Sequence, residues 1–189
     1  IDQTPVTAVF ATNPQDSQAG TTTIFAQISN LPSPTNTPDG RQIRLAVVDA
    51  IPGVTAMIVD LLQPQSRGTI TIASADPLAQ PVIDLGLLSN SDDLDLLTAA
   101  FQIYVKDINA QLLLIDPRYQ LLLPPPAILD DVSLVQSYIQ EVSATDYHYQ
   151  GHCRMAPLNQ GGVVDSYGRV YGVNNLIVAD NSIVPSPID

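Results

Sequence analysis

The sequence has one cysteine, few basic residues and no long run of apolar residues. Cys153 alone cannot form an internal disulfide, which is compatible with a cytoplasmic protein. Seven basic residues stand against nineteen acidic ones, a net charge of -12, whereas a nucleic-acid surface needs clustered lysine and arginine. The apolar runs, such as residues 112–115 and 121–123, are far shorter than the roughly 20 residues of a membrane-spanning helix. We therefore expect no nucleic-acid partner, no membrane span and no disulfide framework.

Two further sequence signals are missing, a dinucleotide-binding motif and a secretion signal. No Gly-x-Gly-x-x-Gly occurs, so the chain lacks the fingerprint of a dinucleotide-binding fold. No leader with basic residues followed by an apolar stretch opens the chain, which predicts a cytoplasmic location. The first residue is Ile1 and not methionine, so we expect the sequence to be cut from a longer parent. Hydrophobic residues make up 45% of the chain, which excludes wholesale disorder.

The order of the periodic segments predicts an α+β fold. Residues 68–74 alternate threonine with isoleucine, which predicts a strand with one buried face. Apolar residues at helical spacing predict two helices, one that starts at residues 91–93 and continues to Leu112, and one over residues 132–142. Runs rich in Val, Ile, Thr and Phe predict the strands, which are residues 7–11, 21–29, 43–49, 56–62, 68–74, 169–171 and 176–179.

Both histidines and the only cysteine lie within six positions, beside a glycine. His148 suits the role of a general base, because imidazole exchanges a proton near neutral pH. The same position also fits a loop histidine that makes one backbone hydrogen bond. The rival interpretation is a metal site made of His148, His152 and Cys153. Gly151 disfavours the helix that would bring both imidazole rings to one face, so we expect no metal.

Two neighbours of the histidines have more than one role open to them. Cys153 fits a catalytic nucleophile, and it also fits a small buried residue. Arg154 fits a group that binds a carboxylate or a phosphate, and it also fits a solvated or salt-bridged arginine. Both alternatives stay open at the level of residue spacing.

Two ordered blocks of the sequence carry a recognisable pattern. Their residues are Tyr147-His148-x-x-Gly151-His152-Cys153-Arg154-Met155, Gly162-Val163-Val164-Asp165 and Arg169-Val170-Tyr171-Gly172-Val173-x-Asn175-Leu176-x-Val178-x-Asp180-x-Ser182-x-x-Pro185, and earlier Leu62-x-Pro64-x-Ser66-Arg67-Gly68-x-Ile70-x-Ile72-x-Ser74-x-Asp76-Pro77, Pro81-x-Ile83 and Asp93. The later block strongly resembles the C-terminal region of glucose–methanol–choline (GMC) oxidoreductases, and the earlier block resembles the substrate-domain strand signature of that family. The resemblance covers residues 55–189.

The resemblance implies flavin-dependent oxidation of an alcohol, with FAD as the cofactor. A histidine at the position of His148 would take the hydroxyl proton while a hydride passes to flavin N5. Asp180 would lie in the flavin-contacting segment with Asn181 beside it, although its position also fits an aspartate in a turn. The implied fold is a mainly antiparallel sheet with helices packed on one face. Residues 1–145 would form the substrate-binding domain, and residues 146–189 a truncated segment that faces the catalytic site and the flavin.

The chain departs from the resembled family in three places. His152 stands where threonine or serine is usual, Ala156 replaces a usual glycine, and the second catalytic histidine or asparagine is expected after Asp189. The sequence also lacks the N-terminal FAD-binding half. We therefore expect a C-terminal fragment of an FAD-dependent oxidoreductase that is inactive alone and holds FAD weakly or not at all.

The expected partners follow from the same resemblance. They are a small alcohol substrate, the missing FAD-binding domain and, through apolar residues at 163–164 and 176–178, a second copy of the chain. The alternative function is a non-catalytic module of the same fold that binds a sugar or another polyol.

Overall fold

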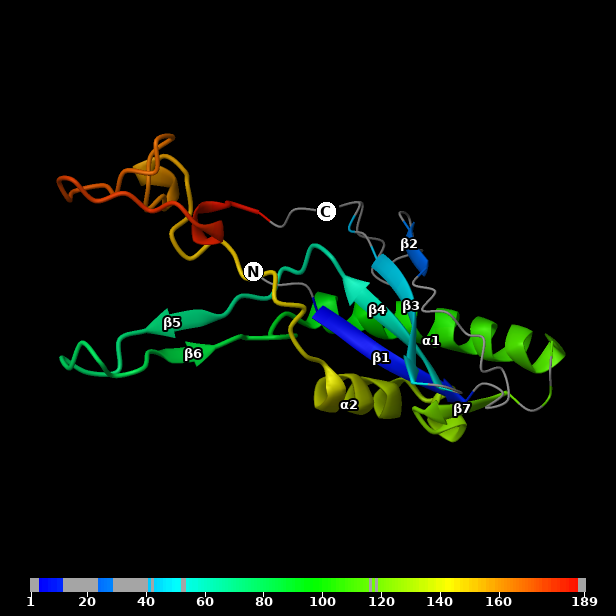
Figure 1. Cartoon of the computed structure of the whole chain (residues 1–189). Helices are drawn as coiled ribbons and strands as arrows, with labels where there is room; N and C mark the ends of the chain where they lie inside the picture. The colour runs from blue at the N-terminus through cyan, green and yellow to red at the C-terminus, as the bar shows by residue number, and fades with distance from the viewer. Residues whose placement is uncertain are drawn as a thin grey trace.

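The computed structural model describes residues 4–11, 24–28, 41, 43–51, 54–115, 117 and 119–186. These residues form a five-stranded antiparallel sheet, a separate two-stranded hairpin, two α-helices and a C-terminal coil (Figure 1). No helix among them is long and apolar enough to cross a membrane. The elements in chain order are β1 (Thr4–Ala11), β2 (Ile24–Ile28), β3 (Ile43–Ile51), β4 (Val54–Leu61), β5 (Thr69–Thr71), β6 (Val82–Asp84), α1 (Ser91–Ile115), β7 (Gln120–Leu123), η1 (Pro126–Ile128), α2 (Val132–Val142), η2 (Leu158–Gln160) and η3 (Asn181–Ile183).

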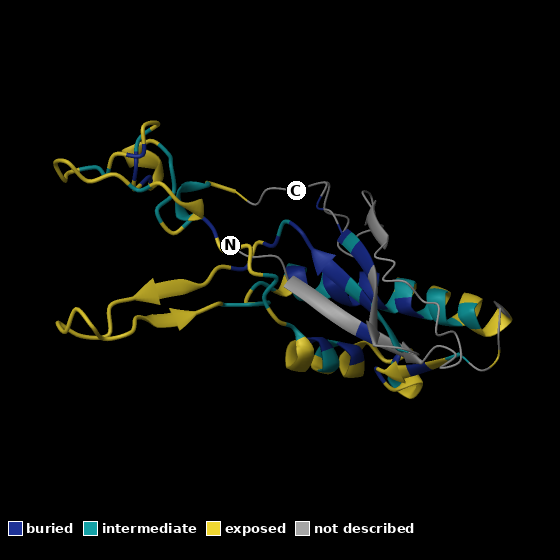
Figure 2. Ribbon diagram, in the orientation of Figure 1, coloured by how far each residue is buried: buried dark blue, intermediate teal, exposed yellow. Residues whose placement is uncertain are grey.

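The core lies between the helices and one face of the large sheet, whose strand order is β2-β3-β4-β1-β7. In the register of β3 and β4, Ile43 lies opposite Leu61 and Leu45 opposite Val59, and all four side chains are buried. Because alternate residues of a strand point to the same face, these four share one side of the sheet. Both helices pack against this side, which confirms the predicted arrangement (Figure 2). The helices contribute Leu96, Leu97, Ala100, Phe101 and Val105 from α1, and Val135 and Ile139 from α2.

Capping residues account for the starts of both helices. Asn90 Oδ1 accepts the N–H of Asp92 at 2.8 Å, just before the first turn of α1. Asp131 accepts the N–H groups of Ser133 and Leu134 at the start of α2, at 2.9 and 3.1 Å. These are the starts that the sequence predicts, and α1 continues past Leu112 to Ile115.

The strand predicted at residues 68–74 exists only in part and has no buried face. β5 pairs with β6 in a hairpin, and every residue of both strands is exposed. Ile70 is 48% exposed and Ile72 is 89% exposed. The prediction of a buried face is wrong because the hairpin projects from the main body instead of joining its sheet (Figures 1 and 2). The strand β6 is not among the sequence predictions.

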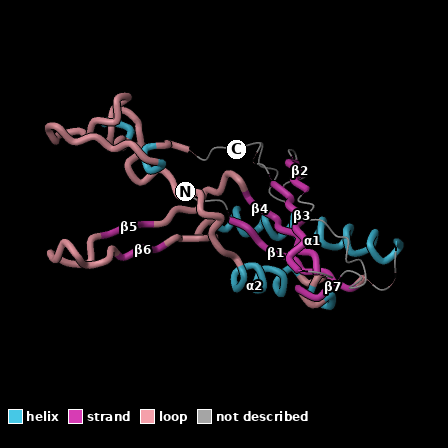
Figure 3. The backbone as a smooth tube through the Cα atoms, in the orientation of Figure 1, coloured by secondary structure: helices cyan, strands magenta, loops and turns pink. Residues whose placement is uncertain are grey.

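Other differences concern short segments. The strand β7 is not among the sequence predictions, and it pairs with β1 to form one edge of the large sheet. The strands predicted at 169–171 and 176–179 are reduced to isolated bridges, one of which joins Arg169 to Ile177. Turns bound the first of these runs on both sides, because Gly168 and Gly172 take the left-handed conformation with φ of 74° and 77°. Figure 3 accordingly shows most of the C-terminal segment as loop. Within the predicted strand at 21–29, residues 21–23 and 29 lie outside the described residues.

Candidate functional site

The segment that follows α2 carries both histidines and contains two left-handed residues. Tyr147 has a φ of 62° and Gly151 a φ of 85°. Glycine adopts this conformation readily, whereas a tyrosine does so rarely and at an energetic cost. The N–H of Tyr147 donates to Thr145 Oγ1 at 2.9 Å, which supports the turn. Strained residues of this kind cluster at functional sites, and Tyr147 directly precedes His148.

His148 lies at the end of a series of contacting charged side chains that leads through Asp146 and Arg44 to Asp60 in the sheet. Its Nε2 is 3.6 Å from Oδ2 of Asp146, and its side chain is 54% exposed. Arg44 Nη2 donates to the same Asp146 oxygen at 2.5 Å, and Arg44 Nε donates to Asp60 Oδ2 at 2.7 Å. Arg44 in β3 is the cross-strand partner of Asp60 in β4. The sheet therefore holds the Asp146 carboxylate beside the imidazole.

Burial shifts the pKa values of the charged side chains in this series. Asp60 is fully buried, and burial raises its pKa to about 6, although the nearby charge of Arg44 lowers it in part. For Arg44, burial acts to lower the pKa, but its bonds to Asp146 and Asp60 outweigh burial and raise it. Burial outweighs the ion pair for Asp60 but not for Arg44, because the Asp60 side chain is 0% exposed and the Arg44 side chain is 24% exposed. At neutral pH both groups are charged, and Arg44 is shared between the two aspartates.

Asp180 and Asn181 lie against the histidine segment. Asp180 caps η3 by accepting the N–H of Ser182 at 2.8 Å. Hydrogen bonds from Ser182 lower the pKa of Asp180, and the charge of His152 contributes in the same direction. Asn181 Nδ2 donates to the carbonyl oxygen of Tyr149 at 2.6 Å. Asn181 therefore fastens the C-terminal segment to the segment around His148 and His152, and Asp180 stabilises the turn that carries Asn181.

Backbone pairing strengthens this attachment. The N–H of Cys153 donates to the carbonyl oxygen of Ser182 at 2.9 Å, and that of Met155 donates to Ile183 at 2.8 Å. Cys153 itself is a free, partly buried cysteine. In the part of the chain that the structure describes, no three His, Cys, Asp or Glu side chains are placed to hold a metal ion. The metal interpretation of His148, His152 and Cys153 therefore finds no support in the geometry.

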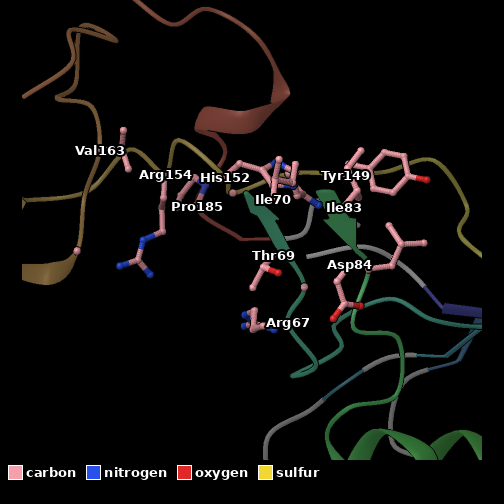
Figure 4. Close-up of a pocket in the computed structure, with 15 residues that line it drawn as sticks. Arg67, Thr69, Ile70, Ile83, Asp84, Tyr149, His152, Arg154, Val163 and Pro185 are labelled. Atoms are coloured by element: carbon pink, nitrogen blue, oxygen red, sulfur yellow. The ribbon is translucent and has the colours of Figure 1, made fainter. Parts of the chain in front are cut away.

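A cavity of about 580 Å³ lies between the β5–β6 hairpin and the segment after α2 (Figure 4). His152 lines it and His148 does not, so the two histidines occupy different places. The sequence analysis did not single out Arg67 or Asp84 as site residues, although Arg67 lies within the earlier of the two patterned blocks. The lining residues are Arg67, Gly68, Thr69, Ile70, Ile83, Asp84, Leu85, Tyr149, Gln150, Gly151, His152, Arg154, Gly161, Val163 and Pro185.

Close backbone contact at the base of the hairpin shapes one wall of this cavity. A Cβ atom at Gly68 would lie 2.2 Å from the carbonyl oxygen of Asp84 and 2.5 Å from that of Leu85. Such distances are sterically impossible for real side chains, and both neighbours are backbone atoms that cannot move independently. Glycine at position 68 is therefore required for the two strands to meet here.

We expect Gly68→Ala to open the hairpin while the main sheet stays folded, because the hairpin packs on neither face of that sheet. Amide hydrogen exchange at Thr69–Thr71 and Val82–Asp84 should speed up by about tenfold or more, as for an overpacked site. Gly172→Ala is the matched control, since nothing lies within 4 Å of its added Cβ and only its positive φ is strained. Unchanged exchange in the hairpin would contradict the argument.

Comparisons with known proteins place this geometry in context. Residues 64–189 match a family model described as GMC oxidoreductase. The chain is 34% identical over 125 residues to a GMC oxidoreductase family protein of Malassezia sympodialis, an alignment that covers 66% of the chain and 20% of that protein. It is 35% identical over 134 residues to an alcohol dehydrogenase [acceptor] of Pseudomonas putida, covering 71% of the chain and 24% of that protein. The chain thus spans a fifth to a quarter of the length of these relatives.

Solved structures show the same fold. A formate oxidase of Aspergillus oryzae RIB40, in a structure concerned with modification of its FAD, aligns with a TM-score of 0.76 at 19% identity and covers 99% of this chain and 42% of that one. An FAD-dependent oxidoreductase of Chaetomium thermophilum aligns with a TM-score of 0.66 at 29% identity, covering 76% of this chain and 24% of that one. Because the formate oxidase is only 19% identical in sequence, its similarity supports the fold of this chain and not its function.

Proposed function

The chain belongs to the GMC oxidoreductase family, and we propose that it forms the substrate-binding part of a longer FAD-dependent enzyme that oxidises an alcohol. One observation carries the proposal. The hairpin and the C-terminal segment lie at the same end of the molecule (Figure 1). The cavity is lined by both and by residues 149–152 of the histidine segment, and Asn181 bonds to that segment through Tyr149. A relative named as an alcohol dehydrogenase supports the choice of substrate class.

Exposed apolar side chains surround this end of the molecule and support the need for a second domain. Isolated exposed apolar residues are ordinary, but a concentration of them marks a surface that another body covers. Val164 is buried, whereas its neighbours in the C-terminal segment are not. The exposed residues of the hairpin and this segment are Ile70, Ile72, Leu78, Val82, Ile83, Leu158, Tyr167, Val173, Leu176 and Ile177, at 47–89% exposure.

The described residues do not form a site that would hold a whole FAD. Asp180 and Asn181 already use their side chains to cap η3 and to bind the carbonyl oxygen of Tyr149, which leaves little to hold a pyrophosphate. The sequence has no glycine-rich phosphate-binding loop. In the proposed enzyme the FAD-binding domain would therefore supply most of the groups that hold the cofactor. When bound, the flavin supplies the acceptor for a hydride.

His148 is the residue we propose as the general base. Its exposed imidazole is accessible to an alcohol that enters from the uncovered side. We propose that this imidazole accepts the hydroxyl proton beside the Asp146 carboxylate. The imidazolium formed in this step is stabilised by the Asp146 carboxylate 3.6 Å away, because opposite charges at this separation attract. Removal of the proton makes the alcohol carbon a better hydride donor.

Arg44 and Asp60 act on this base through Asp146 and touch no substrate. Arg44 prevents the Asp146 carboxylate from turning into solvent, and Asp60 prevents Arg44 from doing the same. The shared Arg44 charge also moderates how strongly Asp146 attracts the imidazolium. We regard the three as positioning residues for His148.

Joining the chain to the FAD-binding half of a GMC relative tests the proposal directly. The joined protein should show the visible absorption of bound flavin, and anaerobic addition of an alcohol should bleach that absorption because the flavin is reduced. The chain alone should remain colourless. A joined protein that binds flavin but is not reduced by any of a panel of primary and secondary alcohols would rule out alcohol oxidation.

The alternative, a non-catalytic module that binds a polyol, has its own supporting observation. The 580 Å³ cavity is built from this chain alone, and the candidate base His148 does not line it. Calorimetric titration of the colourless chain with glucose and glycerol distinguishes the two functions. Saturable binding by the chain, together with no flavin reduction in the joined protein, would favour the binding module.

A further inference from the structure

The basic residues of this acidic chain fall into two groups according to their partners. Four of the six that the structure describes form ion pairs with aspartates at 2.5–2.7 Å, namely Arg41, Arg44, Lys106 and Arg169. The other two, Arg67 and Arg154, form no ion pair with a described carboxylate, although the chain has nineteen acidic residues. Both of these arginines line the cavity between the hairpin and the C-terminal segment.

Backbone carbonyl groups orient these two arginines without neutralising them. Arg67 Nη1 donates to the carbonyl oxygens of Pro64 and Ser66, each at 2.9 Å. Arg154 Nη2 donates to the carbonyl oxygen of Gln160. Figure 4 shows Arg154 on the C-terminal segment and Arg67 at the base of the hairpin, both in the lower half of the group of lining residues. Since a guanidinium has five N–H donors, each arginine keeps donors for a further acceptor.

The rest of the cavity combines an apolar lining with little negative charge. Its volume of about 580 Å³ is within the range of small-molecule sites. His152 adds a third nitrogen donor. Asp84 is the one carboxylate among the lining residues, and its Oδ1 already accepts the N–H of Gly86 at 2.9 Å. The apolar part consists of Ile70, Ile83, Leu85, Val163 and Pro185.

We propose that this cavity binds a small organic anion, with its carboxylate on Arg67 and Arg154 and its apolar body against the isoleucines of the hairpin. Guanidinium groups bind carboxylates through charge-assisted hydrogen bonds, which are stronger than neutral ones. The apolar lining gives the remainder of such a ligand a surface to bury. The site is independent of the proposed oxidation, because it needs neither flavin nor His148.

The test compares three probes of equal length that differ in charge: hexanoate, hexan-1-ol and hexylammonium. Each is titrated into the purified chain at low salt, with binding followed by calorimetry and by the NMR signals of the arginine side chains. Hexanoate should bind about tenfold or more tightly than hexan-1-ol, and hexylammonium should bind most weakly. The preference for hexanoate should decrease as salt is added, because salt screens charge.

Variants assign the effect to the cavity. Arg67→Gln and Arg154→Gln should each weaken hexanoate binding by about tenfold, while Arg154→Lys should retain most of it because the charge remains. Arg169→Gln is the matched control, since Arg169 is already paired with Asp165 and lies outside the cavity. Asp84→Asn should tighten hexanoate binding, because it removes the opposing charge and keeps the oxygen that accepts the Gly86 N–H.

The gain expected of Asp84→Asn cannot result from misfolding, so the proposal stays testable if an arginine variant is unstable. Equal affinity for the three probes would overturn the proposal. So would hexanoate binding that Arg169→Gln weakens as much as Arg67→Gln does. Neither result would bear on alcohol oxidation, which flavin reduction in the joined protein measures separately.

Discussion

His148→Ala should lower the rate of alcohol oxidation in the joined enzyme by about 10²–10⁴-fold, the usual effect of losing a general base. The reason is local, because His148 is the proposed base and its Nε2 lies 3.6 Å from the Asp146 carboxylate that would stabilise the imidazolium. The flavin should stay bound, since His148 is proposed to act on the substrate and not to hold the cofactor. Stopped-flow measurement of flavin reduction, with flavin content determined from absorption, gives both quantities.

Two variants serve as controls for this result. His152→Thr restores the residue usual in the family and should leave the rate within about one order of magnitude, because His152 faces Asp180 and the cavity. Asp146→Asn should give an intermediate loss, since the base remains and only the charge that stabilises the imidazolium is removed. Full turnover in the His148→Ala enzyme would exclude the assignment of the base.

The helices and the main sheet were predictable because their signals are local. Acceptors at Asn90 and Asp131 precede apolar residues at helical spacing, and the strands β3 and β4 are rich in branched apolar residues. The β5–β6 hairpin was not predictable from the sequence. β6 has only three residues, and β5 has the alternating pattern of a half-buried strand although no layer of the protein covers it. An alternating apolar pattern indicates which side chains of a strand could share a buried face. Whether that face is buried depends on the rest of the fold.

The candidate site was predictable only in the part that lies in one stretch of sequence. His148 is found from the pattern of its neighbours, and Asp180 and Asn181 from the same resemblance. The contacts around His148 are not local, because Arg44 is 16 positions from Asp60 and 102 from Asp146. They depend on the register of β3 against β4 and on the path of the chain after α2. No spacing rule connects residues that only the tertiary fold brings together.

A second buried carboxylate joins the hairpin to the helical layer. Asp93, in the first turn of α1, is 0% exposed. Its Oδ1 accepts from Arg41 Nη1 at 2.6 Å and from the N–H of Gln65 at 3.0 Å. Its Oδ2 accepts from the N–H and the hydroxyl of Ser66, both at 2.6 Å. Asp93 thus connects the start of α1 with the segment that leads into β5, and it neutralises an arginine whose side chain is 5% exposed.

Asp93→Asn should therefore lower the free energy of unfolding by about 3–5 kcal/mol, the usual cost of removing one partner from a buried ion pair. The amide keeps one accepting oxygen, but its NH₂ group faces donors that have lost their acceptor, and Arg41 is left charged and buried. Urea unfolding followed by circular dichroism measures the loss.

Asp95→Asn, on the same helix, is the matched control, because it alters only the bond to Gln136 and should cost about 1 kcal/mol or less. Equal losses in the two variants would show that the buried ion pair is not what joins these elements. A loss confined to Asp93→Asn, partly recovered when Arg41→Met is added, would show that the buried charge of Arg41 accounts for much of the cost.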